Sequence, residues 1–212
     1  MAHANPHPRD EEPSRERILA TAARLFARYG SAGMSLQMLA DEVGLHKSTL
    51  FHHFSGKDEL LHLMLQAELG RILTVIEPLA TDTPPSLDQL LTVAGALVDH
   101  FAREREAGLI LLRSIVSPEL SDKTVPEGLE RVERHVFTII GAWLDRARRA
   151  GVIRNVRVRH ALVNLLGLVL FYPAVADDEL GREILGGDPN SPRALRTRKE
   201  ELASFLRGAL AP

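Results

Sequence analysis

The chain has 212 residues, of which 45% are hydrophobic and 25% are charged, and it contains no cysteine. This composition is typical of a globular protein with one sizeable core or with a small domain beside a larger one, and the lack of cysteine excludes a disulfide framework and a thiolate metal site. The formal net charge of -2 gives no overall sign of nucleic-acid binding, for which a strongly basic domain is the simple indicator.

The start of the chain predicts a flexible arm and no secretory signal. Residues 1–13 are polar and contain three prolines, and no apolar segment occurs near them. Further along, the longest apolar stretch, residues 161–176, is interrupted by Asn164 and Pro173 and is shorter than the roughly 18 residues that span a bilayer. We therefore expect a cytoplasmic protein that does not enter a membrane.

Three short helices are predicted after the arm. Ser14 can cap the first helix, whose apolar side chains recur at helical spacing until Gly30 ends it in the left-handed conformation. Ser35 can cap the second helix, and Gly44 can adopt the positive φ that ends it. The third helix begins almost at once. Together these elements predict a small N-terminal domain over residues 14–57.

Longer helices are predicted in the rest of the chain, residues 58–212. Ser55 opens the first of them and Pro78 ends it, because proline cannot continue a helix. The others are separated by proline and glycine residues and cover residues 86–105, 107–116, 126–150, 156–175 and 192–210. No segment shows the alternation that is typical of strands. The predicted fold is therefore all-α, with a three-helix N-terminal domain and a larger helical C-terminal domain.

The second and third helices and the turn between them have the compactness of a helix-turn-helix. Ala40 is small where the helices would cross, Gly44 makes the turn, and apolar side chains such as Leu50 bury the joint. The outer face of the third helix then stays free to enter the major groove of B-DNA, which is about 12 Å wide. Between residues 15 and 57, six basic residues stand against three acidic ones, so this end of the chain is basic.

The candidate DNA contacts lie on that outer face and at its borders. They are Ser35, Gln37, Lys47, Ser48, Thr49, Phe51, His52, His53 and Lys57. Lys47 and Thr49 can reach base edges or phosphates, and the methyl group of Thr49 suits a thymine. Lys57, in the first turn of the next helix, is the best candidate for a phosphate clamp. The adjacent His52 and His53 point about 100° apart on a helix, so we expect no metal site there.

Five short segments carry a resemblance to a known family. They are ILATAARLF at 18–26, YG at 29–30, LADEVGL at 39–45, KSTLFHHF at 47–54 and KDEL at 57–60. Together they resemble the N-terminal helix-turn-helix domain of the TetR family of bacterial transcriptional regulators. Phe51 stands where this family commonly has a tyrosine that touches a phosphate, His46 where it has a capping serine or threonine, and Ser48 where it often has glycine. These departures concern single DNA contacts and not the fold.

The resemblance implies a ligand-responsive regulator, usually a repressor, that binds a palindromic operator on double-stranded DNA as a homodimer. Dimerisation would use the last two long helices, about residues 156–175 and 192–210, the first of which is apolar over more than one face. A small-molecule effector, which the sequence does not identify, would bind in the C-terminal domain and change the distance between the two reading helices. No cofactor is implied.

A few residues inside the apolar helices are candidates for the effector site, because a ligand pocket uses a small number of such groups for orientation. They are Met64, His100, Arg113, Trp143, Asn164 and Tyr172. Taken singly, each of these is more often a core or interface residue. A charged run at residues 193–201 has mixed signs, so we interpret it as a solvent-facing side of a helix rather than a second nucleic-acid patch.

Other interpretations remain open. The helix-turn-helix can be a helical corner that binds no DNA, and the chain would then be a protein-interaction module. An activator without effector control would share the same reading helix. A helical enzyme would use histidine and carboxylates, but the sequence has no nucleophile elbow, phosphate loop or metal-spaced histidine cluster, so we expect no enzyme.

Overall fold

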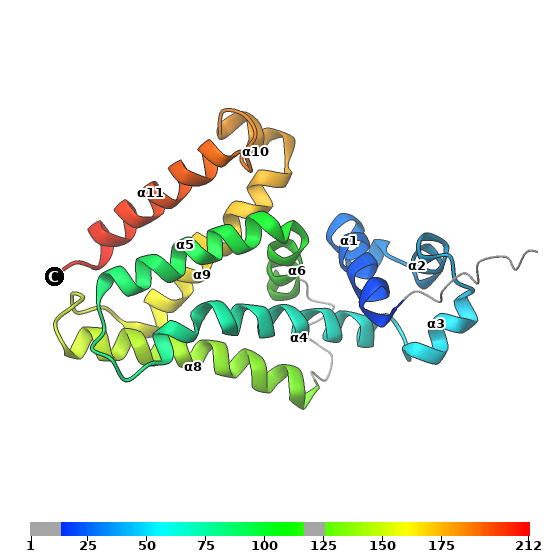
Figure 1. Ribbon diagram of the computed structural model, residues 1–212, viewed down its shortest axis with the longest axis horizontal. Helices are drawn as coiled ribbons and strands as arrows, with labels where there is room; N and C mark the ends of the chain where they lie inside the picture. Colours follow the sequence, from blue (N-terminus) through cyan, green and yellow to red (C-terminus); the bar gives the residue numbers. More distant parts are fainter. Residues whose placement is uncertain (1–13, 117–125) are drawn as a thin grey trace, which may run out of the picture. The chain divides into compact units, whose positions relative to one another are not determined.

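The computed structural model describes residues 14–116 and 126–212, coloured along the chain in Figure 1. Every regular element in these two ranges is a helix, which confirms the predicted all-α fold. The chain forms two compact units, Met1–Leu61 and His62–Pro212. The expected arm at residues 1–13 lies outside the described residues.

The first unit holds α1 (Arg15–Gly33), α2 (Leu36–Val43), α3 (Lys47–His53) and the first residues of α4 (Lys57–Ile76). Its predicted caps are confirmed. Oγ of Ser14 accepts a hydrogen bond from the backbone N–H of Arg17 at 3.3 Å, and Oγ of Ser35 accepts one from that of Met38 at 3.1 Å. Gly44 ends α2 with φ 75° and ψ 30°, the left-handed conformation that a glycine adopts without strain.

Gly30 interrupts α1 without ending it. Its φ of 71° is positive, but its ψ of 179° is extended, so it does not have the left-handed helical conformation that was predicted. One further turn follows up to Gly33, and the backbone N–H of Met34 donates to the carbonyl oxygen of Gly30 at 3.1 Å. The regular helix therefore breaks at the predicted residue, and a short extra turn is added after it.

The helices of the first unit pack around a small apolar core. Its most deeply buried side chains, none more than 2% exposed, include Ile18, Ala22, Phe26, Met34, Leu39, Ala40, Leu50 and Phe54. α1 contacts α2, and α2 contacts α3. Ala40 and Leu50 therefore lie at the joint between the second and third helices, as the sequence predicted.

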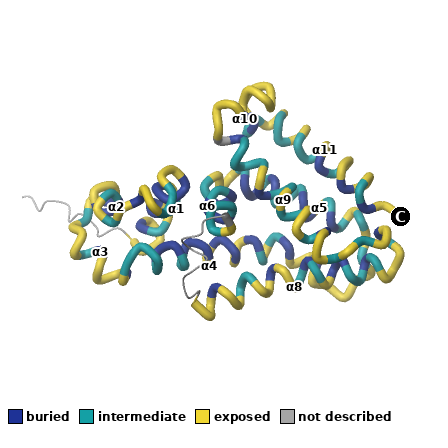
Figure 2. Tube along the Cα trace, turned by 180° about the vertical axis from the view of Figure 1, so that it is seen from behind, coloured by how far each residue is buried: buried dark blue, intermediate teal, exposed yellow. Residues whose placement is uncertain are grey.

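The second unit holds the rest of α4, the 3₁₀ helix η1 (Glu77–Ala80), and α5 (Leu87–Arg103), α6 (Arg105–Val116), α8 (Glu127–Arg149), α9 (Val158–Asp177), α10 (Glu179–Ile184) and α11 (Pro192–Leu210). All five long helices predicted after Pro78 are present. α9 contacts α5, α6, α8 and α10, and α11 packs along α5. Figure 2 shows a dense series of buried residues along α4, whereas α10 is exposed over most of its length.

α10 is a helix that the sequence pattern did not predict. The carboxylate of Asp178 caps it by accepting a hydrogen bond from the backbone N–H of Gly181 at 3.2 Å. Glycine is required at 181, since a Cβ there would lie 1.8 Å from the carbonyl oxygen of Val175. The helix has only 6 residues, too few for helical periodicity to show in the sequence.

The charged side of α11 is less solvated than the sequence predicted. Nζ of Lys199 lies 2.9 and 3.0 Å from the two carboxylate oxygens of Asp99 on α5. Nη2 of Arg198 donates to the carbonyl oxygen of Leu168 on α9 at 2.5 Å. These two half-buried cations therefore fasten α11 to its neighbours, whereas Arg193, Arg196, Glu200 and Glu201 of the same run are exposed, as a solvent-facing side requires.

α9 is also more apolar than its interruptions suggested. Its 19-residue segment Val158–Ala176 has a mean hydropathy of 1.5, and among the described residues it is the one helix long and apolar enough to cross a membrane. Packed helices of soluble proteins pass the same test, and α9 contacts four other helices. However, only 11% of the segment is buried. α9 therefore presents apolar side chains that the described residues of one copy leave uncovered.

Candidate nucleic-acid interface and effector cavity

The outer side of α3 consists of side chains that reach solvent. We call Lys47, Ser48, Thr49, Phe51, His52 and His53 the reading face; all are exposed except Thr49, which is half-buried. On the opposite side, Leu50 is 1% exposed and the following Phe54 is 2% exposed. The core therefore holds one side of this short helix, while the reading face is available to the edges of bases and to phosphates.

Two departures from the family pattern have structural consequences at α3. Phe51 is 50% exposed, and Nζ of Lys47 lies 5.9 Å from the centroid of its ring. A phenylalanine has no hydroxyl for a phosphate, so Phe51 contributes a ring against which Lys47 is placed, one helical turn away. His46 is the N-cap residue of α3, but its side chain makes no capping hydrogen bond.

Ser35 and Gln37, the predicted contacts on α2, are exposed at the beginning of that helix. Each already makes one hydrogen bond within α2: Ser35 caps the helix, and Nε2 of Gln37 donates to Oδ1 of Asp41 at 2.7 Å. The hydroxyl hydrogen of Ser35 and the second amide hydrogen of Gln37 can still be donated to a phosphate.

Lys57 has a structural role that the sequence did not predict. Its Nζ donates to the carbonyl oxygen of Ser31 and, at 3.4 Å, to that of Met34. These carbonyls belong to the end of α1, where helix carbonyls lack partners within the helix and a cation is favourable. An ammonium group has three donors, so one remains for the predicted phosphate contact.

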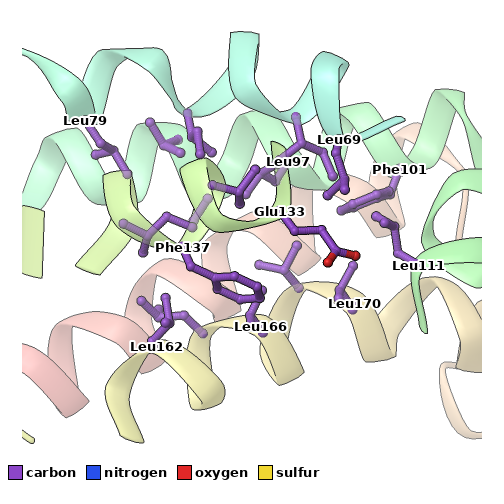
Figure 3. Close-up of a pocket in the computed structure, with 18 of the residues that line it drawn as sticks. Leu69, Leu79, Leu97, Phe101, Leu111, Glu133, Phe137, Leu162, Leu166 and Leu170 are labelled. Atoms are coloured by element: carbon purple, nitrogen blue, oxygen red, sulfur yellow. The ribbon is translucent and has the colours of Figure 1, made fainter. Parts of the chain in front are cut away.

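The second unit contains an apolar cavity of about 120 Å³ between α4, α5, α6, α8 and α9. Figure 3 shows side chains from these helices converging on it. The lining residues are Leu69, Ile72, Ile76, Leu79, Leu90, Val93, Ala94, Leu97, Phe101, Leu111, Ser114, Ile115, Glu133, Val136, Phe137, Ile140, Leu162, Leu165, Leu166, Val169 and Leu170. All of them are apolar except Ser114 and Glu133. Such a cavity suits a ligand with a hydrophobic body and few polar groups.

Glu133 is the charged residue of this lining. In Figure 3 its carboxylate points into the space near Phe101, Leu111 and Leu170. Burial raises the pKa of the Glu133 carboxyl above its ordinary value, and the neighbouring negative charge of Glu130 raises it further. The half-buried site therefore favours the protonated form of this carboxyl more than water does.

The six predicted ligand residues do not line this cavity. Met64 is buried on α4, Arg113 is half-buried on α6, and Asn164 is exposed on α9. Trp143, 0% exposed, donates from Nε1 to Oε1 of Gln89 at 2.7 Å. The remaining two, His100 and Tyr172, also bond to other groups of the protein.

Tyr172 and His100 have partners that explain their place in apolar helices. The hydroxyl of Tyr172 donates to the carbonyl oxygen of Pro189 at 3.2 Å, and its ring lies under the Arg198 guanidinium, 4.8 Å from the centroid. Nε2 of His100 lies 2.6 Å from Oε1 of Glu68. An effector role for any of the six therefore stays a prediction without support from their position.

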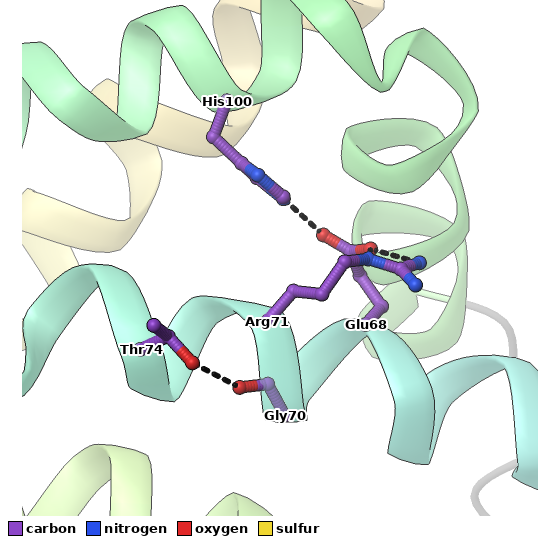
Figure 4. A network of polar contacts seen from close by, with 5 residues as sticks. All are labelled: Glu68, Gly70, Arg71, Thr74 and His100. Atoms are coloured by element: carbon purple, nitrogen blue, oxygen red, sulfur yellow. Dashed lines mark hydrogen bonds and ion pairs between the residues drawn. The ribbon is translucent and has the colours of Figure 1, made fainter.

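Figure 4 shows the network around Glu68, which joins α4 to α5. Its second oxygen, Oε2, accepts from Nε of Arg71 at 2.9 Å and from Nη2 at 2.6 Å. Glu68 is 1% exposed, so these bonds satisfy a carboxylate that is buried almost completely. The network stabilises the packing of α4 on α5 beside the cavity.

A signal for Glu133 exists in the sequence, although the prediction did not use it. Val136, Phe137 and Ile140 follow Glu133 at three, four and seven residues, the spacing of one apolar helix face. A single carboxylate on such a face is either satisfied by a partner or placed for a ligand. The leucines that line the rest of the cavity have no comparable signal, because their pattern is that of any core.

Comparison with known proteins supports the assignment of the first unit. Residues 18–64 match the family model described as bacterial regulatory proteins, tetR family. The chain is 29% identical over 107 residues to the uncharacterized HTH-type transcriptional regulator YerO of Bacillus subtilis, a match that covers 50% of the chain and 37% of that protein. It is 30% identical over 101 residues to the HTH-type transcriptional regulator SAR2658 of Staphylococcus aureus, covering 44% of the chain and 53% of that protein. The chain thus spans about two fifths to half the length of these relatives.

Solved structures of similar fold cover nearly the whole chain. The TetR family transcriptional regulator PfmR from Thermus thermophilus matches with a TM-score of 0.70 at 24% identity, over 94% of this chain and 98% of that one. AibR in complex with isovaleryl coenzyme A and operator DNA matches with a TM-score of 0.70 at 18% identity, over 90% of this chain and 96% of that one. FadR from Bacillus subtilis in complex with stearoyl-CoA matches with a TM-score of 0.68 at 14% identity, over 91% of this chain and 97% of that one. At these identities the likeness shows the fold, which includes both units.

Proposed function

Because this chain belongs to the TetR family of bacterial regulatory proteins, we propose that it is a repressor that binds a palindromic operator as a homodimer and leaves it when a small molecule binds. It is a DNA-binding regulator of transcription with a helix-turn-helix. Repression, the operator, the dimer and the effector are the proposed parts. We propose that the protein acts in the cytoplasm, where its operator would be.

The observation that carries the proposal is the reading face on α3. Its six side chains reach solvent, five of them exposed and Thr49 half-buried, whereas Leu50 of the same helix lies in the core and is 1% exposed. A protein-interaction corner would need no such series of lysine, hydroxyl and imidazole groups, whereas base edges and phosphates are recognised by these groups. The DNA reading is therefore favoured over an interaction module.

A second copy of the chain would cover the apolar surface of α9 and α11. Val163 and Phe171 of α9 are 65% and 63% exposed, and Phe205 of α11 is 59% exposed. A groove between the two helices is lined by residues of both, including Val163, Leu168 and Phe205. Large exposed apolar patches of this kind mark association sites, and a two-fold dimer brings the same patch together twice. This supports dimerisation through the two predicted helices.

The apolar cavity is the proposed effector site. The structural neighbours AibR and FadR bind isovaleryl coenzyme A and stearoyl-CoA, which have aliphatic groups. In this chain, α4 contributes Leu69, Ile72 and Ile76 to the cavity, and the same helix begins in the first unit at Lys57. A ligand that shifts α4 would therefore act on a helix shared by both units, which is the proposed route from effector to DNA.

A gel-shift assay with the DNA upstream of the protein's own gene tests this function. The wild-type chain should retard this DNA, and Thr49→Ala should weaken binding by about tenfold, the effect of one lost base contact. Thr74→Ala is the matched control, because Thr74 is an exposed threonine on α4 in the second unit. Equal loss in both variants, or no binding by the wild type at low salt, would contradict the proposal.

Transcription from the same promoter separates repression from activation. Deletion of the gene should raise expression of a reporter under the upstream region if the protein is a repressor. A fall in expression would instead support an activator with the same DNA-binding unit.

A further inference from the structure

The cavity of the second unit has an unbalanced charge. Among the described residues its lining contains one carboxylate, that of Glu133, and no lysine, arginine or histidine. Among the described residues, Glu133 makes no hydrogen bond or ion pair, and the nearby Arg134 is bonded to Glu130 instead. Glu133 is half-buried, and a carboxylate that is partly desolvated without gaining a partner is destabilising in an apolar site. A ligand that brings a positive charge would supply the missing partner.

The aromatic residues of the lining favour the same kind of ligand. Phe101 and Phe137 both line the cavity, and in Figure 3 their rings lie on either side of the Glu133 side chain. The face of an aromatic ring attracts an ammonium group, and a carboxylate forms a charge-assisted hydrogen bond with it. The remaining aliphatic walls suit a hydrocarbon body.

From this geometry we infer that the effector is an amphiphilic amine, an apolar molecule with one protonated nitrogen that binds the carboxylate of Glu133. This inference rests on the proposed effector cavity and names the chemical class of its ligand. A carboxylate ligand of the same size is disfavoured, because its negative charge would face Glu133 with no cation among the described lining residues to offset it.

The inference can be tested with three probes of equal chain length that differ in charge. Octylamine is cationic, octanol is neutral and octanoate is anionic at neutral pH, and isothermal titration calorimetry measures their binding to the full-length protein. We expect octylamine to bind about tenfold more tightly than octanol, as a charge-assisted hydrogen bond allows, and octanoate to bind most weakly.

Glu133→Gln is the decisive variant, because it keeps the shape of the side chain and removes its charge. It should bind octylamine and octanol with affinities within about twofold of each other, since the ion pair is gone. Glu130→Gln is the matched control. It removes a neighbouring carboxylate that does not line the cavity, and it should keep most of the preference for octylamine.

Leu166→Trp, which fills the cavity with a larger side chain, separates this inference from the effector cavity itself. Loss of octanol and octylamine binding in this variant would place both probes in the cavity. If the three probes bind wild type equally, or if Glu133→Gln keeps the preference for octylamine, the amine inference is overturned while the effector cavity stands. If no probe binds, or if Leu166→Trp binds them as wild type does, both are overturned.

Discussion

Nε2 of His100 lies 2.6 Å from Oε1 of Glu68, and the two residues are 6% and 1% exposed. This contact joins α5 to α4 in a region where both helices also line the cavity. A buried carboxylate oxygen that loses its hydrogen-bond partner is left unsatisfied, which costs more than the bond contributes when both partners are present.

We therefore expect His100→Leu to lower the free energy of unfolding by about 2–3 kcal/mol, because Oε1 of Glu68 would lose its partner while Oε2 keeps Arg71. The double variant Glu68→Leu with His100→Leu should recover a large part of this loss. Urea denaturation followed by circular dichroism measures both. His135→Leu, a change at an exposed histidine of the same unit, should stay near wild type.

Substitutions of Lys57 and Lys47 should differ in their effects on the free energy of unfolding and on DNA binding. Lys57→Met removes the hydrogen bonds from Nζ to the carbonyl oxygens of Ser31 and Met34, so it should lower the free energy of unfolding by about 1–2 kcal/mol. Lys47→Met, at an exposed position of the reading face, should change stability by less than about 0.5 kcal/mol and still weaken DNA binding. Equal stability of the two variants would contradict the structural role of Lys57 at the end of α1.

The exposed apolar residues of α9 and α11 predict a dimer that a single substitution to a charged residue disrupts. Phe205→Glu replaces an exposed apolar side chain of this surface with a carboxylate and should shift the protein from dimer to monomer in size-exclusion chromatography with light scattering. Ile184→Glu is the control, because Ile184 is a 71% exposed apolar residue on α10 that does not line the groove. Dimers in both variants would place the interface elsewhere.

Glu133 predicts a pH dependence of stability with a defined sign. Its pKa is raised by burial and by Glu130, so the folded state binds this proton more tightly than the unfolded state. Stability from this group is therefore highest below the unfolded pKa and falls as the pH rises through the raised folded pKa. Glu133→Gln should gain thermal stability relative to wild type as the pH increases from 4 to 8, and a difference that is constant with pH would contradict the assignment.

The fold and the reading helix could be predicted because local chemistry specifies them. Ser14 and Ser35 cap their helices and Gly44 has the left-handed backbone, so each boundary depends on a side chain or a glycine visible in the sequence. The position of Leu50 in the core follows from helical periodicity in the same way. These features involve residues close together in the chain.

The effector cavity could not be predicted in this way, because it depends on contacts between distant helices. Trp143 and His100 are polar groups within apolar helices and were therefore predicted to bind the effector, but their polar atoms bond to Gln89 and Glu68. The lining leucines of five different helices have the same pattern as any other buried leucine. Glu133 is informative only once its neighbours are known to form a cavity.

The salt dependence of operator binding tests the central claim most directly. If the reading face binds DNA, the logarithm of the affinity should fall linearly with the logarithm of the salt concentration, and Lys47→Met should reduce that slope by about one if Lys47 contacts a phosphate. Fluorescence anisotropy with labelled upstream DNA measures both slopes. Binding by the wild type that is insensitive to salt, or no binding at any salt concentration, would contradict the assignment of α3 as the DNA-reading helix.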